Sequence, residues 1–170
     1  MTDNGPVVSI IGFGEAGASL CFGWNRRCVR GFDIKLKRAQ TRTAILAAMK
    51  KLSVNATKDA ATAVRNADLI FSTVTADQAF SAASSVIPGL KRGAFFFDLN
   101  SCAPTTKLES EAVIEAAGGR YVDVAVMATI TPHYHKTPML ICGKHSDDRF
   151  GTHHARDVSD LFDYKFPLPI

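Results

Sequence analysis

The sequence has few cysteines, and none of them belongs to a metal or redox motif. Only Cys21, Cys28, Cys102 and Cys142 occur in 170 residues, and no two stand in a C-x-x-C pair. That spacing excludes a zinc ribbon or a thioredoxin-type centre. We therefore expect a cytoplasmic protein whose reduced cysteines pack as small buried hydrophobes.

Charge is not concentrated in one block either. The formal net charge is +4, and the densest basic run, Lys35, Lys37, Arg38 and Arg42, is mixed with apolar residues. A nucleic-acid-binding protein presents a continuous basic face with stacking aromatics, so we expect no nucleic-acid partner. The histidines at 133, 135, 153 and 154 have no carboxylate or cysteine at ligand spacing, and we predict no metal site.

No hydrophobic run is long enough and continuous enough for a membrane span. Residues 7–24 carry a single charge, but glycines at positions 12, 14, 17 and 23 interrupt them. A strand followed by a helix explains this pattern better than a membrane helix does. The sequence also lacks internal repeats and low-complexity tracts, and 46% of its residues are hydrophobic, which is typical of one globular domain.

What the sequence does contain is a regular alternation of short β-rich runs with helical patterns. Such alternation predicts βαβ units, and hence an α/β fold with a doubly wound parallel Rossmann sheet in three layers. We expect strand order 3-2-1-4-5-6 for the first six strands. A threonine at position 57 is expected to cap the third helix, and Thr75 to Gln78 has the spacing of a capping box. The expected strands are 7–11, 29–33, 53–55, 69–74, 94–99, 121–127 and 139–142, and the expected helices are 15–24, 37–51, 57–65, 75–87 and 104–117.

A glycine-rich motif follows the first expected strand. Gly12-Phe13-Gly14-Glu15-Ala16-Gly17 reads G-x-G-x-x-G and opens the first expected helix. In this setting the first glycine permits a tight turn, the second lets backbone approach a pyrophosphate, and the third allows close packing of helix on sheet. The start of a helix also attracts phosphate. These six residues are therefore predicted to bind a dinucleotide.

The choice of dinucleotide depends on the end of the second strand. Asp33 lies 21 residues beyond Gly12, where a carboxylate accepts hydrogen bonds from ribose hydroxyls and repels a 2′-phosphate. Lys35 and Arg38 follow closely and are suited to a 2′-phosphate. We predict NAD as the cofactor, with NADP as the alternative.

Five stretches of residues 6–143 carry a resemblance to a known group. They are VVSIIGFGEAG, ADLIFSTVTAD, FFFDLNSCAPTTK, GGRYVDVAVMA and PMLICG. With them the chain resembles the β-hydroxyacid dehydrogenases, which include 3-hydroxyisobutyrate and 6-phosphogluconate dehydrogenases. The resemblance implies an oxidoreductase that transfers hydride to or from a small hydroxy acid, with the nicotinamide near Val74 and Thr75.

The same resemblance implies a substrate-binding loop after the fifth strand. The group's D-x-S-[ST]-x-x-P pattern reads Asp98 to Pro104 here, so that Ser101 falls on the hydroxyl that contacts substrate and Asn100 replaces a serine. An asparagine amide is able to hold a carboxylate or hydroxyl. The alternative interpretation is that Asn100 and Ser101 only cap the following helix.

Two departures separate this sequence from the group. The D-x-P-x-S-G-G pattern is replaced by the residues from Asp123 to Thr129, which lack Ser-Gly-Gly. The group's helical second domain, with its lysine acid/base, has no counterpart, and no catalytic residue is identified. We expect a dinucleotide-binding domain over 1–143 and a divergent tail over 144–170. The alternative function is a truncated, non-catalytic NAD(P)-binding module, and an uncovered apolar face would favour a homo-oligomer.

Overall fold

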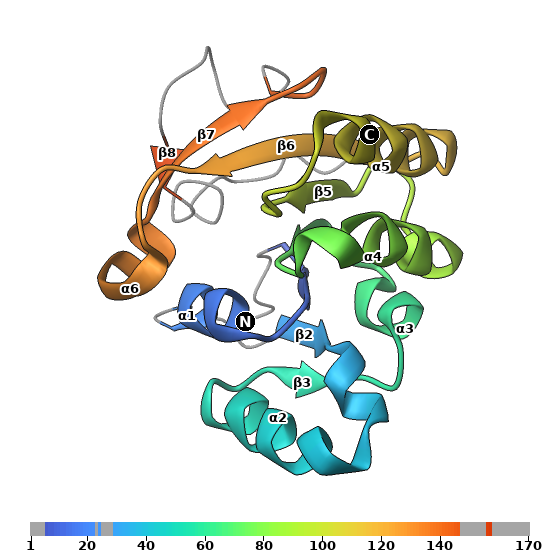
Figure 1. Ribbon diagram of the computed structural model, residues 1–170. Coiled ribbons are helices and arrows are strands. Elements are labelled where there is room, and N and C mark those ends of the chain that lie inside the picture. The colour runs from blue at the N-terminus through green and yellow to red at the C-terminus, as the bar shows by residue number, and fades with distance from the viewer. Residues whose placement is uncertain (1–5, 23, 25–28, 147–155, 158–170) are drawn as a thin grey trace, which may run out of the picture.

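The computed structural model describes residues 6–22, 24, 29–146 and 156–157. Its elements follow the alternation that the sequence predicts (Figure 1). The strands are β1 (Val8–Ile11), β2 (Val29–Phe32), β3 (Asn55–Ala56), β4 (Leu69–Ser72), β5 (Phe95–Asp98), β6 (Arg120–Val126), β7 (Pro138–Cys142) and β8 (Arg156–Asp157). The α-helices are α1 (Glu15–Cys21), α2 (Ala39–Lys51), α3 (Ala60–Val64), α4 (Ala79–Val86), α5 (Pro104–Ala116) and α6 (Ile130–His133), and the short 3₁₀ helices are η1 (Ile34–Lys37), η2 (Ala76–Gln78), η3 (Ile87–Gly89) and η4 (Tyr134–Lys136).

The strands form one sheet in the order β3-β2-β1-β4-β5-β6-β7-β8. The first six pair in parallel in the predicted order, with β1 between β2 and β4. The Rossmann prediction is therefore confirmed. The chain reverses its direction of winding between β1 and β4, which is where open α/β sheets bind ligands.

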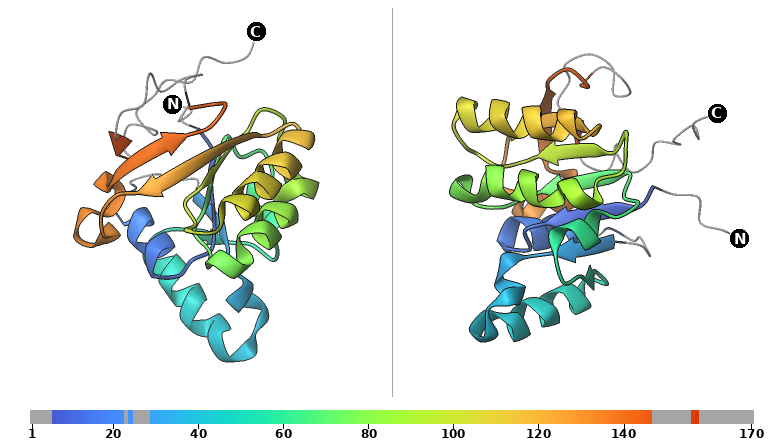
Figure 2. Two further views of the ribbon diagram at one scale, coloured as in Figure 1. Left: turned by 45° about the horizontal axis from the view of Figure 1, so that its top comes forward. Right: turned by 90° about the vertical axis from the view of Figure 1, so that its right-hand side faces the viewer.

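Helices cover both faces of the sheet. α3, α4 and α5 lie side by side over one face, and both views of Figure 2 show α4 against α5. α1 and α2 cover the opposite face, where a methyl of Met49 from α2 and Ile10 from β1 both approach Gly31. α6 and η4 return across the fold to lie beside α1 (Figure 1), so residues 130–136 close the same end of the sheet as the glycine loop.

The core sits between these layers and is rich in phenylalanine. β1, β4 and β5 are buried along their whole length, which is why their sequences are nearly continuous apolar runs. The rings of Phe71 and Phe97 stack with centroids 5.0 Å apart, and Phe97 stacks on Phe95 at 5.9 Å. Stacked rings of this kind anchor β4 to β5, so the loops that leave these strands start from a rigid base.

Several details differ from the sequence prediction. Asp59, not Thr57, caps α3, because its carboxylate accepts from the Thr62 amide at 2.7 Å. Hydrogen bonding from the Thr62 side chain, and then from this amide, lowers the pKa of Asp59. The Thr57 hydroxyl instead donates to main-chain oxygens. Thr75 does not form the predicted capping box, because its side chain bonds to Asp77. The first helix ends at Cys21 rather than at residue 24.

The thiols are also less uniform than predicted. Cys21 is buried, and its burial raises the pKa of the thiol, whereas Cys142 is exposed. Cys102 is partly buried, and desolvation together with the carboxylate of Asp98 raises the pKa of its thiol. Cys28 lies outside the described residues. The expectation of buried cysteines is therefore wrong for Cys142.

Candidate functional site

The loop between β1 and α1 uses its glycines for close contacts. Gly12 has φ +90°, and a Cβ added there would lie 2.5 Å from the carbonyl oxygen of Thr73. A Cβ on Gly17 would lie 2.3 Å from the Gly12 oxygen. Both positions therefore exclude any side chain. Gly14 differs, since a Cβ there would meet nothing within 4 Å, and the loop consequently presents bare backbone to open space at the start of α1.

Thr73 fastens this loop to the end of β4. Its hydroxyl donates to the carbonyl of Gly12 at 2.8 Å, and its amide donates to the carbonyl of Ile11 at 2.8 Å. No motif in the sequence singles out Thr73, although its place after β4, next to the predicted Val74, could have suggested it. These two bonds hold the ends of β1 and β4 together at the point where the sheet changes its direction of winding.

Asp33, at the end of β2, is buried against the same loop. One carboxylate oxygen accepts from the Phe13 amide at 2.6 Å, and the other accepts from the Lys35 amide at 2.8 Å. Each carboxylate oxygen has capacity for a second donor. The side chain of Phe13 is buried in the core, whereas Lys35 and Arg38 are exposed immediately after Asp33. The exposed cations Lys35 and Arg38 therefore lie close in sequence to the Asp33 carboxylate, which holds the glycine loop through the Phe13 amide.

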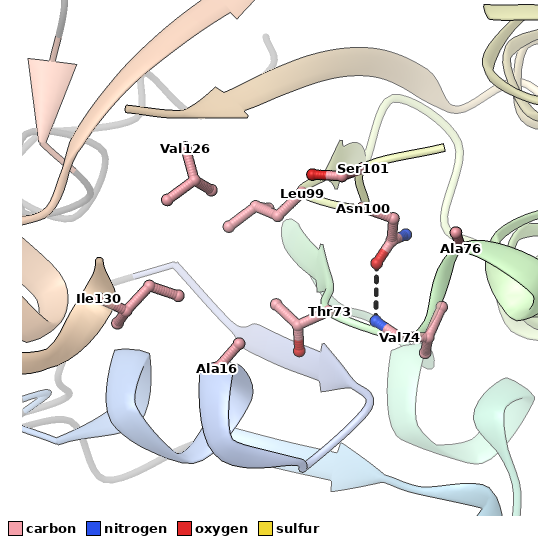
Figure 3. A pocket seen from close by; sticks show the side chains of 9 residues that line it. All are labelled: Ala16, Thr73, Val74, Ala76, Leu99, Asn100, Ser101, Val126 and Ile130. Carbon is pink, nitrogen blue, oxygen red and sulfur yellow. Dashed lines mark hydrogen bonds between the residues drawn. The ribbon is translucent and has the colours of Figure 1, made fainter. Parts of the chain in front are cut away.

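A pocket of about 270 Å³ opens between the ends of these strands (Figure 3). Its walls come from α1 and from the loops after β4, β5 and β6, and most of its lining side chains are apolar. The polar groups among them are hydroxyls and one carboxamide, and no ionisable side chain is in the set. The lining residues are Ala16, Thr73, Val74, Ala76, Leu99, Asn100, Ser101, Val126 and Ile130.

Asn100 lies in this wall with its carboxamide turned toward Val74 (Figure 3). Its Oδ1 accepts from the Val74 amide at 2.7 Å, and its Nδ2 donates to Ser72 Oγ at 3.0 Å and to Asp98 Oδ1 at 2.6 Å. α5 begins at Pro104 behind Ala103, with no side-chain cap. The alternative that Asn100 and Ser101 cap this helix is therefore wrong.

Behind Asn100 lies a buried polar network centred on Asp98, whose side chain is 1% exposed. Lys107 Nζ lies 3.3 Å from Asp98 Oδ1 and 2.7 Å from Asp123 Oδ1. The Tyr121 hydroxyl donates to Asp98 Oδ2 at 2.7 Å. Burial, and then the bond to Asp98, raises the pKa of Tyr121 well above its usual range. The network joins β5, β6 and α5 directly beneath the pocket.

The structure brings together four of the predicted site residues at the pocket: Ala16, Val74, Asn100 and Ser101. Thr75 is exposed outside the lining, and Asp33 lies behind the glycine loop. The prediction missed Leu99, Ala76, Val126 and Ile130. Their common signal is position, because the carboxyl ends of neighbouring parallel strands meet at one edge of the sheet.

Two further absences concern the described part of the chain. Among residues 6–22, 24, 29–146 and 156–157, no three histidine, cysteine, aspartate or glutamate side chains gather closely enough to hold a metal ion. His135 Nδ1 instead lies 3.2 Å from the carbonyl of Phe22, and His153 and His154 lie outside these ranges. No helix in the same ranges combines the length and apolar character that a membrane crossing needs.

This combination of a glycine turn, an acidic end of β2 and a pocket at the switch point agrees with comparison to known families. Residues 7–147 match the family described as the NAD-binding domain of 6-phosphogluconate dehydrogenase. The chain belongs to this family. It is an NAD-binding domain of oxidoreductase type, as the glycine motif and the resemblance predicted. No curated protein matches the sequence.

Solved structures share the fold of this NAD-binding domain. A conserved hypothetical protein from Sinorhizobium meliloti superposes with a TM-score of 0.78 at 30% identity, over 84% of this chain and 48% of that one. The 3-hydroxyisobutyrate dehydrogenase of Mycobacterium tuberculosis, solved with L-serine, gives 0.71 at 20% identity, over 83% and 47%. An imine reductase from Myxococcus stipitatus in complex with NADP⁺ gives 0.65 at 24% identity, over 83% and 48%. The chain thus spans about half the length of these relatives.

Proposed function

We propose that the domain binds NAD(H) for hydride transfer to or from a small hydroxy acid or a related compound. The observation that carries the proposal is the open space at Gly14, where a Cβ would meet nothing within 4 Å although its neighbouring glycines are tightly packed. A pyrophosphate fits there because bare backbone and the first turn of α1 offer N–H groups. The nicotinamide then lies in the adjacent pocket against Val74, with Thr75 as its other predicted neighbour. The loop residues Gly12, Phe13, Gly14, Glu15, Ala16 and Gly17 are assigned to the pyrophosphate side of the dinucleotide.

The substrate would approach from the loop after β5. Ser101 is exposed and lines the pocket, so its hydroxyl is free to bond a substrate oxygen. Asn100 keeps one lone pair on Oδ1 beyond the bond that it accepts from Val74. We assign Ser101 and Asn100 to substrate binding on these grounds.

We place the protein in the cytoplasm and its domain boundary at residue 143, as the sequence predicts.

A second candidate is a module that binds NAD(P) without turnover. It is favoured by the pocket lining, in which none of the nine residues is ionisable, because proton transfer to or from an alcohol requires a positioned acid/base. Binding and turnover measured on one sample separate the two candidates.

The proposal is tested by titrating the purified chain with NAD⁺, NADP⁺ and ADP-ribose in a calorimeter. We expect micromolar-range binding of NAD⁺, weaker binding of NADP⁺, and retained binding of ADP-ribose, which carries the pyrophosphate and the Asp33-side ribose. Absence of binding by all three nucleotides would overturn the proposal. Tighter binding of NADP⁺ than of NAD⁺ would overturn only the choice of cofactor.

Asp33→Ala should narrow the preference for NAD over NADP. The substitution removes the acceptor for the ribose hydroxyls and the charge that repels a 2′-phosphate, while Lys35 and Arg38 remain. The matched control is Asp68→Ala, because Asp68 Oδ2 also accepts from a backbone amide, that of Val7 at 2.8 Å, but outside the site. We expect the ratio of the two dissociation constants to move toward NADP only in Asp33→Ala. An equal ratio in both variants would contradict the assignment of Asp33.

A further inference from the structure

We infer that Asn100 is a positioning residue for the nicotinamide half of the cofactor. Its carboxamide fixes the backbone at Val74, the wall of the pocket against which we place the ring. This inference rests on the proposed function, since it requires a nicotinamide in that pocket. It assigns to Asn100 a task in addition to contact with substrate.

The carboxamide of Asn100 bonds to the backbone of Val74. Oδ1 of Asn100 accepts from the Val74 amide at 2.7 Å across two different loops, after β5 and after β4. The bond lies directly in the pocket wall, as Figure 3 shows. A backbone amide that loses its acceptor in a partly buried place must find water or move, and the cost is comparable to that of a lost hydrogen bond. The position of Val74 therefore depends on this carboxamide.

Asn100 is itself held rigidly. The residue is 3% exposed, and both hydrogens of Nδ2 are used, toward Ser72 Oγ and Asp98 Oδ1. The Asn100 amide also donates to Asp98 Oδ1 at 2.9 Å. Asp98 in turn is held by Tyr121 and Lys107. The carboxamide consequently has one orientation, with its acceptor aimed at Val74.

The two halves of the proposed cofactor site are held by separate sets of bonds. The glycine turn is held by Thr73, through its amide to Ile11 and its hydroxyl to Gly12, and by Asp33 through the Phe13 amide. None of these bonds involves Asn100. Loss of the Asn100 carboxamide should therefore disturb the pocket wall and leave the pyrophosphate loop in place.

The experiment compares two ligands on two variants. NADH carries the nicotinamide, and ADP-ribose is the same molecule without it. Asn100→Ala removes the acceptor for Val74, whereas the control Ser110→Ala removes a buried hydroxyl whose bond to the carbonyl of Thr106 lies outside the pocket. We expect Asn100→Ala to weaken NADH binding about ten-fold with less than about a two-fold change for ADP-ribose. Ser110→Ala should leave the ratio of the two affinities unchanged, and the fluorescence of bound NADH should change only in Asn100→Ala.

The outcomes are distinguishable. If the wild-type chain binds neither ligand, the proposed function fails. If it binds both, and Asn100→Ala weakens both equally or neither, the positioning role fails alone. A readout on the wild type decides the matter even if Asn100→Ala does not fold. In ¹⁵N spectra, NADH but not ADP-ribose should shift the Val74 amide and the Asn100 side-chain amide, and unmoved resonances would overturn the inference.

Discussion

The three glycines of the loop after β1 differ in what a side chain would meet. Gly12 and Gly17 are enclosed by backbone atoms within 2.5 Å of a Cβ, whereas Gly14 faces open space. The sequence motif alone does not distinguish the surroundings of the three glycines. The structure divides them into two that the fold requires and one that is available to a ligand.

Gly14→Val should therefore fold normally and lose NAD(H) binding. The added side chain occupies the space that we assign to the pyrophosphate. Its Cβ has no protein atom within 4 Å, so the fold should tolerate it. Gly17→Val is the contrasting variant, since its Cβ would overlap the Gly12 oxygen at 2.3 Å, and we expect it to unfold at a much lower temperature. Calorimetric titration and thermal unfolding of both variants check the prediction. Unchanged binding by a folded Gly14→Val would contradict the site.

The buried hydroxyl of Tyr121 predicts a loss of stability in alkali. Burial and the bond to Asp98 raise its pKa in the folded state, while in the unfolded chain tyrosine ionises at about pH 10. The neutral Tyr121 hydroxyl therefore makes its full contribution to the free energy of unfolding below about pH 10. This contribution falls as the pH rises further, by up to about 1.4 kcal/mol per pH unit. Urea unfolding of wild type and Tyr121→Phe at a series of pH values isolates this group, because the other titrating groups cancel in the difference. A constant difference across the series would contradict the prediction.

The site residues that could be predicted from the sequence are those that belong to a motif. The glycines, Asp33 and Asn100 stand at fixed places relative to strands, so the end of the sheet on which they lie followed from the alternation. The Ser72 and Val74 partners of Asn100 were not predictable, because they meet it only after β4 and β5 pair. Hydrogen bonds between loops carry no periodic signal in the sequence.

At the scale of elements, periodicity identified the strands better than the caps. Long apolar runs such as those of β4 and β5 were found because both of their faces are buried. β7 was located, but its antiparallel direction depends on how residues 127–137 return across α1. The choice of Asp59 over Thr57 as a cap depends on which of two nearby oxygens reaches the helix amide. Competing local hydrogen bonds of this kind differ little in energy.

Lys107 connects α5 to the end of β5 and to the middle of β6, and its removal should destabilise the fold. Its side chain is 14% exposed and its ammonium lies between Asp98 and Asp123, so Lys107→Met leaves the buried Asp98 charge without a cation. The expected cost is about 3 kcal/mol. Lys91→Met is the control, because Lys91 and Asp68 form an exposed pair, whose loss should cost less than about 1 kcal/mol. Urea unfolding measures both, and equal losses would contradict a bracing role for Lys107.

At the scale of the whole molecule, the nine residues that line the pocket include no ionisable side chain. Its polar groups are hydroxyls and a carboxamide, and loss of a positioned acid/base costs a factor of about 10²–10⁴. We expect cofactor binding together with turnover far below the ordinary range of about 1–10³ s⁻¹. A steady-state assay with NAD and NADP against a panel of hydroxy acids and imines checks this. A rate within that range would show that the described pocket has the acid/base it needs.

The pocket described above has walls from four separate parts of the chain, from Ala16 to Ile130. No unfolded or partly folded chain assembles these walls, so a ligand in the pocket binds only the native state. Ligand at 100 times its dissociation constant would then add about 2.7 kcal/mol to the free energy of unfolding. The folding equilibrium of the protein therefore depends on the concentration of nicotinamide dinucleotide around it. A higher concentration lowers the fraction of unfolded chain that proteases are able to cleave.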